Sequence, residues 1–184
     1  MKLHTTFASI AIAAALAAGV QTASAQVMVG GAAMLASRDI VDNAVNSRDH
    51  TTLVAAVKAA GLVETLKGPG PFTVFAPVNA AFDALPSGTV DSLLKPENKP
   101  ALSKVLTYHV VAGRMDSGGL VKAIDAGGGK ATLKTVSGGT LTATRSGSTV
   151  MVADESGGTA RVAIADVIQS NGVIHVVDKV LLPK

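Results

Sequence analysis

The sequence predicts an α+β fold, because apolar residues follow a helical spacing in the first half of the domain and a strand pattern in the last third. Residues 39–126 hold most of the helical stripes, and residues 130–182 hold short apolar runs separated by Gly- and Ser-rich turns. One strand, residues 72–76, interrupts the helices and carries two of the four phenylalanines of the chain. Such a strand is expected at the centre of the core, since aromatic side chains bury the most apolar area.

Residues 1–25 have the pattern of a secretory signal peptide. Lys2 precedes an apolar run over residues 7–18, and Ala23-Ser24-Ala25 provides an A-x-A cleavage site. The run is too short for a spanning helix. We therefore expect a protein that is secreted or periplasmic after signal-peptide removal.

Cleavage would leave an extended N-terminal arm, residues 26–38, followed by one domain, residues 39–184. The leader holds one charged side chain, Lys2, so the mature chain keeps 15 of the 16 basic residues against 13 acidic ones. Near-neutrality without a Lys/Arg cluster argues against nucleic acid as a partner. The chain has no cysteine, so packing rather than disulfides must stabilise it.

The domain is expected to begin with short helices. Apolar stripes predict one helix over residues 40–45, a second that follows Thr51 or Thr52 and ends at Gly61, and a further turn over residues 62–66. His50 lies ahead of the second helix and is expected to be solvated.

The central strand leads into an aromatic corner. Residues 72–76 are apolar on both faces, which indicates a strand covered on both sides. Pro77 ends the strand, and Asn79 is expected to cap a short helix over residues 80–85. Phe82 on that helix should fold back over the strand. The three aromatic residues expected in the core are Phe72, Phe75 and Phe82.

Helices and strands alternate next. Stripes at residues 90–94 and 102–106 predict two helices, the second running directly into an apolar strand, residues 108–111. Residues 117–126 can form one more helix. Five strands are then expected, over residues 131–136, 140–145, 149–153, 160–168 and 173–182. Asn171-Gly172 before the last one is the sequence of a type I′ turn, in which Gly172 has positive φ.

Three segments, residues 71–82, 108–111 and 171–183, together resemble the signature segments of the fasciclin domain, an extracellular adhesion and matrix module. They stand in the family's order and cover nearly all of the chain after Arg38. The resemblance implies a compact wedge of two packed sheets with helices along one side.

Motifs of enzymes are missing from the sequence. No Ser sits in G-x-S-x-G, no Asp/Glu pair falls on one predicted face, and Gly127-Gly128-Gly129-Lys130 lacks the other parts of a phosphate loop. The mature histidines are His50, His109 and His175, and their spacing fits no metal site. We expect a non-enzymatic protein with no catalytic residue, metal or cofactor.

Polar residues interrupt two of the predicted strands. His109, His175 and Asp178 would each cost burial energy unless they are hydrogen-bonded. One interpretation is a structural network that ties the 108–111 strand to the C-terminal hairpin; the other is a site that faces a ligand. Strand alternation points His175 away from Asp178.

The resemblance implies one candidate contact site. Fasciclin-like adhesion modules are proposed to contact animal receptors through a Tyr-His pair with flanking branched apolar residues. The matching residues are Tyr108, His109, Leu106, Val110 and Val111. Their alternative role is in the core, with the Tyr108 ring partly buried and its hydroxyl near the surface.

The resemblance and the leader together predict a secreted, non-enzymatic adhesion or interaction module, from a bacterium and suited to a matrix or biofilm. Expected partners are cell-surface or matrix proteins or glycans and other copies of the chain, without stable membrane insertion. The alternative is a periplasmic or extracellular binding protein for a small ligand or polysaccharide. It requires a pocket with convergent polar groups, which the sequence does not identify. A second alternative is a hydrolase, which would need a nucleophile beside a base.

Overall fold

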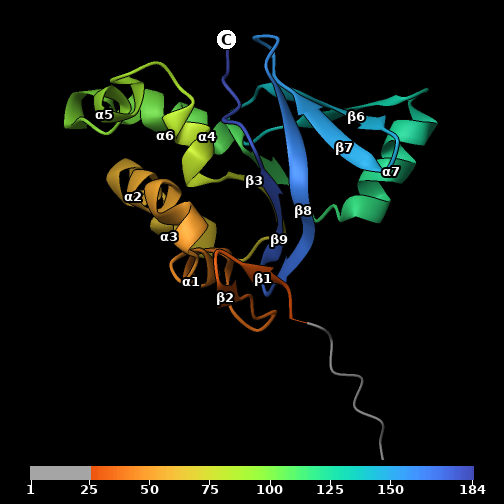
Figure 1. Cartoon of the computed structure of the whole chain (residues 1–184), viewed down its shortest axis with the longest axis horizontal. Helices are drawn as coiled ribbons and strands as arrows, with labels where there is room; N and C mark the ends of the chain where they lie inside the picture. The colour runs from red at the N-terminus through yellow and green to blue at the C-terminus, as the bar shows by residue number, and fades with distance from the viewer. Residues whose placement is uncertain (1–25) are drawn as a thin grey trace, which may run out of the picture.

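The computed structural model describes residues 26–184, and the predicted signal peptide lies outside them. Helices α1 to α6 cover one face of a curved β-sheet, and α7 lies on the opposite face (Figure 1). Helices and a mixed sheet in one domain confirm the predicted α+β class.

The N-terminal arm is a small hairpin rather than an extended segment. Strands β1 (Met28–Val29) and β2 (Ala32–Ala33) pair antiparallel. Val29 and Met34 are buried in the main core, so the apolar side chains of this Gly- and Ala-rich stretch fold it onto the domain.

The helices are short. Asp39 caps α1, its carboxylate accepting a hydrogen bond from the Asp42 amide (2.8 Å). Gly61 ends α2 with a left-handed conformation, as its position in the sequence predicts. The α-helices are α1 (Ile40–Ala44), α2 (Thr51–Ala60), α3 (Val63–Lys67), α4 (Asn79–Asp83), α5 (Thr89–Leu93), α6 (Lys99–Tyr108) and α7 (Ser117–Ala126). The 3-10 turns are Arg48–His50 and Pro96–Asn98.

Seven strands form one mixed sheet in the order β4-β3-β9-β8-β7-β6-β5. The pair β3·β9 is parallel and the other neighbours are antiparallel. The strands are β3 (Phe72–Pro77), β4 (Val110–Ala112), β5 (Lys130–Lys134), β6 (Thr140–Ser146), β7 (Thr149–Ala153), β8 (Thr159–Gln169) and β9 (Gly172–Val177).

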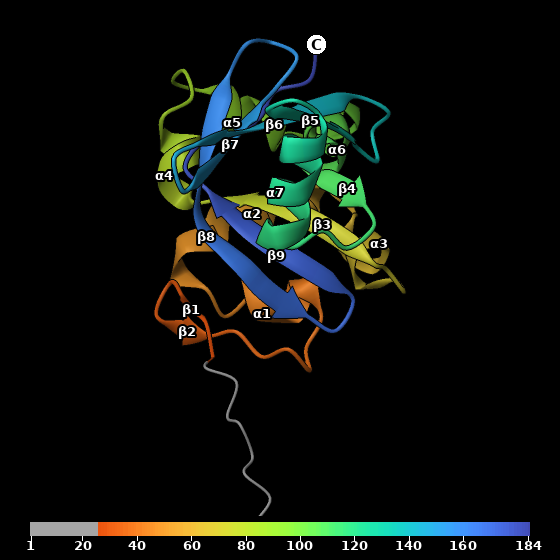
Figure 2. The ribbon, with the colours of Figure 1, turned by 90° about the vertical axis from the view of Figure 1, so that its right-hand side faces the viewer.

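The sheet curls back on itself, as Figure 2 shows. Strand β8 belongs to both halves, and its register against β9 shifts twice between Val162 and Val167, where Asp166 has positive φ (59°). At the far end, the Val136 amide donates to the Val110 carbonyl (2.8 Å), so the two edges of the sheet meet. The two sheets of the expected wedge are therefore halves of one bent sheet.

The two faces of the sheet bury two separate cores. The helix-side core lies between α1–α6 and β3/β9, and includes Ile40, Val41, Leu53, Leu66, Phe82, Leu106 and Ile174. The sheet-side core lies inside the curl under α7, and includes Phe75, Tyr108, Leu120, Leu141, Val152, Val177 and Leu181. Phe75 is fully buried, as predicted, whereas Phe72 is half-buried at the start of β3.

The predicted type I′ turn is wrong. The loop between β8 and β9 is Ser170-Asn171, because Gln169 pairs with Gly172, and neither Asn171 nor Gly172 has positive φ. Asn171 instead joins three segments: its Oδ1 accepts from the Ile40 amide (3.1 Å), and its Nδ2 donates to the Leu66 carbonyl (2.7 Å). Gly172 is required by space, since a Cβ there would collide with the Phe72 carbonyl oxygen.

The predicted cap at the aromatic corner is also wrong. Pro77 is the last residue of β3, and α4 begins at Asn79 with Val78 as its N-cap. The Asn79 side chain points to α2, where its Oδ1 accepts from the Thr52 amide (3.0 Å) and its Nδ2 donates to the Arg48 carbonyl (2.8 Å). Asn79 therefore caps a helix 27 residues earlier in the chain.

Candidate functional site

Tyr108 is an interior residue. It ends α6 instead of starting a strand, and its side chain is fully buried in the sheet-side core. The hydroxyl donates to the Thr140 carbonyl (2.7 Å) and accepts from the Glu155 amide (3.0 Å). The expectation of a partly exposed ring is wrong, because the β6 and β7 ends close over the hydroxyl and satisfy it.

His109 ties α6 to the C-terminal segment. Its Nδ1 lies 2.8 Å from the Val105 carbonyl, and its Nε2 accepts from the Leu181 amide (2.9 Å). These partners require a neutral ring with the proton on Nδ1. Burial lowers the pKa of His109 to about 4, so the ring is neutral at neutral pH.

The other members of the expected contact site are buried too. Leu106 and Val110 belong to the helix-side core, and Val111 belongs to the sheet-side core. The structure therefore brings the five candidates together at the junction of α6 and β4, below the surface. Each of the five side chains is at most 5% exposed, so they offer almost no surface to a partner.

His175 and Asp178 lie apart. His175 on β9 is fully buried, stacks on Phe75 (5.6 Å between ring centroids) and bonds through Nε2 to the Met115 carbonyl (2.8 Å). Burial lowers its pKa. Asp178 follows β9, where its carboxylate accepts from the Arg161 amide (2.7 Å). The predicted link from residues 108–111 to the C-terminus is therefore made by His109, not by His175.

His50 is buried, which corrects the expectation that it is solvated. It is 3% exposed, and its Nδ1 lies 2.9 Å from the Ser47 hydroxyl. Its Nε2 makes no hydrogen bond of good geometry among residues 26–184, although the Ala76 backbone lies close enough to the ring to raise its pKa against the larger effect of burial. Burial lowers the pKa of His50, so the ring is neutral at neutral pH.

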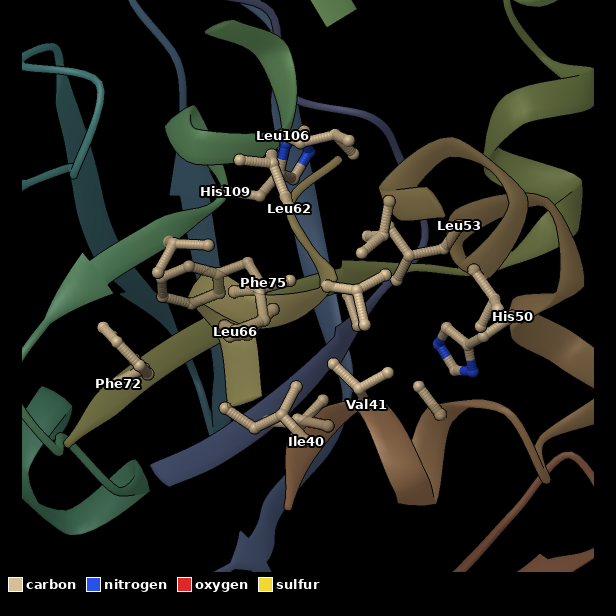
Figure 3. A pocket seen from close by; sticks show the side chains of 18 of the residues that line it. Ile40, Val41, His50, Leu53, Leu62, Leu66, Phe72, Phe75, Leu106 and His109 are labelled. Carbon is tan, nitrogen blue, oxygen red and sulfur yellow. The ribbon is translucent and has the colours of Figure 1, made fainter. Parts of the chain in front are cut away.

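His50 lines an apolar cavity of about 70 Å³ between the helical layer and the sheet. Figure 3 shows His50 on the opposite side of this cavity from Phe72, with Ile40, Val41, Leu53 and Leu66 between them. Most of the lining side chains are apolar. Sequence reasoning missed the cavity and the burial of His50, because a short helical stripe does not tell how tightly its residues pack.

Within residues 26–184, no group of three or more His, Asp or Glu side chains is arranged to hold a metal ion. None of the helices in this range is long and apolar enough to cross a membrane.

The domain combines helices on one face of a curled sheet with a C-terminal hairpin that Asn171 anchors. This chain can be compared with known domain families. A model of the fasciclin domain matches residues 48–183. The chain therefore belongs to the fasciclin domain family, which confirms the resemblance seen in the sequence.

Similar proteins support this family membership, and a solved structure supports the fold. The chain is 46% identical to Protein sll1483 of Synechocystis over 166 residues, covering 90% of this chain and 85% of that protein. It is 38% identical to pig transforming growth factor-beta-induced protein ig-h3, covering 78% of this chain but 19% of that protein. It is similar in fold to the FAS1 domain pair of the insect cell adhesion molecule Fasciclin I, with a TM-score of 0.69, 18% identity, and coverage of 79% of this chain and 51% of that one.

Proposed function

We propose that this chain is a secreted, non-enzymatic interaction module that binds cell-surface or matrix proteins or glycans, or other copies of itself. The observation that carries the proposal is the family membership over residues 48–183. Two similar proteins bear names that fit it: the insect cell adhesion molecule Fasciclin I, and the cell surface glycolipoprotein MPB83 of Mycobacterium bovis, which is 35% identical.

The Tyr108-His109 segment serves this function from inside the domain. Both side chains use their polar atoms on neighbouring backbone, so they hold the C-terminal segment and the β6–β7 end in place. Partner binding then uses the outer surface that these residues support. Val136 is one exposed apolar residue beside this segment, since its amide bonds to the Val110 carbonyl.

The test is adhesion of whole cells and matrix extracts to surfaces coated with the purified, exported protein. We expect retention above an albumin-coated surface, and loss of that retention when the protein is unfolded by heat. Tyr108→Phe and His109→Gln should lower the melting temperature, and retain binding at temperatures where they are folded. Retention no higher than on albumin would refute the proposal.

Export depends on the leader. We propose cleavage after Ala25, which gives a mature N-terminus at Gln26. The intact mass of exported protein should lack residues 1–25. Retention of these residues in exported protein would contradict the proposed processing.

A further inference from the structure

Half of the curled sheet has an outer face that is open to solvent. On β5, Ala131 and Leu133 belong to the sheet-side core, whereas Lys130, Thr132 and Lys134 are exposed. Helix α7 packs against the inner side of β5, β6 and β7 (Figure 2). The outward side chains of these strands are therefore available to a partner.

The strand register aligns the outward residues of β5 to β8 in rows across the sheet. One row is Lys130, Thr144, Met151 and Arg161, and the next is Thr132, Thr142, Ala153 and Thr159. The members on β5 and β8 are exposed, and the members between them are half-buried. Since neighbouring strands lie about 4.8 Å apart, each row is about 14 Å long.

The middle of this face carries hydroxyl groups that the fold does not use. Thr132, Thr142 and Thr144 make no side-chain hydrogen bond within residues 26–184, whereas the Thr140 hydroxyl donates to the Glu155 carboxylate (2.8 Å). A free hydroxyl can both donate and accept. The two rows therefore offer hydrogen bonds of both kinds to a partner.

The charges on this face are positive. Its outward positions include Lys130, Lys134 and Arg161 and no carboxylate. Arg161 lies 3.5 Å from Asp178, but neither lysine forms an ion pair within residues 26–184. The two lysines stand about 13 Å apart along β5, at the rise of a strand. Two separate positive charges thus border a surface of hydroxyls.

This combination selects a partner with many hydroxyls and widely spaced negative charges. Nucleic acid binds through many cations that neutralise its phosphates, and two free lysines do not supply them. A sugar chain offers hydroxyls to the threonines and an apolar ring face to Met151, and its carboxylates can pair with the lysines.

We propose that the outer face of β5 to β8 binds an extended polysaccharide whose sugars carry carboxylates. The proposal rests on the interaction function above, and adds the class of partner and the surface that meets it. Tyr108 supports this face from the inside, since its hydroxyl bonds to the Thr140 carbonyl and the Glu155 amide.

The experiment uses the purified, exported protein and three probes in calorimetry. They are oligogalacturonate, its methyl ester, which has the same sugars without the charge, and polyglutamate of equal charge, which has no sugar. We expect oligogalacturonate to bind, and the two other probes to bind at least about tenfold more weakly, equivalent to about 1.4 kcal/mol.

Two pairs of lysines give matched variants. Lys130→Gln with Lys134→Gln should weaken oligogalacturonate binding at least about tenfold. Lys58→Gln with Lys122→Gln removes the same charge from exposed positions on α2 and α7, and should leave binding unchanged.

The hydroxyls are tested by Thr142→Val with Thr144→Val, which keeps the branched shape that suits a strand. This variant should bind oligogalacturonate several-fold more weakly and melt at the wild-type temperature.

Three results would each overturn the proposal: no binding of oligogalacturonate, polyglutamate binding as tightly, or equal losses in the two lysine pairs. Retention of cells on the coated surface by a protein that does not bind oligogalacturonate would refute this site and leave the adhesion proposal standing. Binding of oligogalacturonate without retention of cells or matrix would refute the adhesion proposal and support this site.

Discussion

The two cores of this domain are built differently. In the sheet-side core most members are fully buried, whereas every member of the helix-side core keeps some exposure, from 1% to 9%. The sheet-side core is enclosed by hydrogen-bonded strands and by α7, a helix of ten residues. The helix-side core is covered partly by helices of five residues.

The short helices do not fill the helix-side core completely. The cavity of about 70 Å³ lies in the helix-side core, and at about 24 cal/mol per Å³ an empty space of that size costs on the order of 1–2 kcal/mol. The sheet-side core shows the opposite solution: Tyr108, and the His175 ring that stacks on Phe75, are packed without exposure, although His175 Nδ1 has no partner among residues 26–184. One side of the sheet is thus closely packed, and the other keeps a small apolar cavity at some expense of stability.

A matched pair of leucines tests this difference with the largest expected effect. Leu141→Ala in the sheet-side core should lower the free energy of unfolding by about 4–5 kcal/mol, because the strands around it cannot close the gap. Leu53→Ala beside the cavity should cost about 2–3 kcal/mol, because short helices can move inward. Urea denaturation measures both. Equal losses would show that the two cores pack equally well.

The second prediction concerns His109, where the two cores meet. The unfolded ring takes up a proton near pH 6.5, but burial lowers the pKa of the folded ring to about 4. Below pH 6.5 the unfolded state therefore binds more protons, so stability is full above this pH and falls as the pH drops toward 4. The loss should reach about 3 kcal/mol at pH 4.

The variant His109→Gln isolates this group, since an amide can still donate and accept but does not titrate. Its stability should fall less steeply between pH 6.5 and 4 in urea titrations. A residual slope is expected from His50 and His175, because burial lowers the pKa of both. An identical slope in wild type and variant would contradict the assignment.

The third prediction concerns the turn that anchors β9 beside α1. A Cβ at residue 172 would meet the Phe72 carbonyl oxygen and lie 3.1 Å from Ile40 Cδ1. Gly172→Ala should therefore cost about 1–3 kcal/mol by overpacking. Gly118→Ala in α7 is the control, because its Cβ would meet just the Asp116 carboxylate at 3.5 Å. That variant should be as stable as wild type or slightly more so.

Sequence patterns predicted the structural features that are set by residues close together in the chain. The helix stripes and Gly61 placed α2, and the β-branched and aromatic run placed β3 with Phe75 at its centre. Alternation along β9 also pointed His175 away from Asp178, and in the structure it lies apart from Asp178 and stacks on Phe75. These features follow from local periodicity and conformational preference.

What the sequence did not predict depends on distant contacts. Asn171 was expected to form a type I′ turn with Gly172. Its side chain instead hydrogen-bonds to the backbone of Ile40 and Leu66, more than 100 positions away. The α6 helix extends through Tyr108, so the apolar strand starts two residues later than its composition suggests. His50 was expected to be solvated because it lies ahead of a helix, yet it is 3% exposed and lines the apolar cavity.

Asn79 provides the smallest of the expected effects and tests whether the helix-side core is held by single polar contacts. Its Oδ1 accepts from the Thr52 amide, and its Nδ2 donates to the Arg48 carbonyl, so it fixes the start of α2 against α4. Asn79→Ala removes both bonds and the bond that Oδ1 accepts from the Thr51 hydroxyl (3.2 Å), and should cost about 0.5–2 kcal/mol, the usual loss for an N-cap. Asn79→Asp keeps the acceptor for Thr52, adds a negative charge that favours a helix N-terminus, and loses the donor to Arg48. It should recover most of the stability if the cap is the important contact. Urea denaturation separates the outcomes: equal losses in both variants would assign the stabilisation to the Arg48 bond, and no loss in either would show that α2 is held by its apolar face alone.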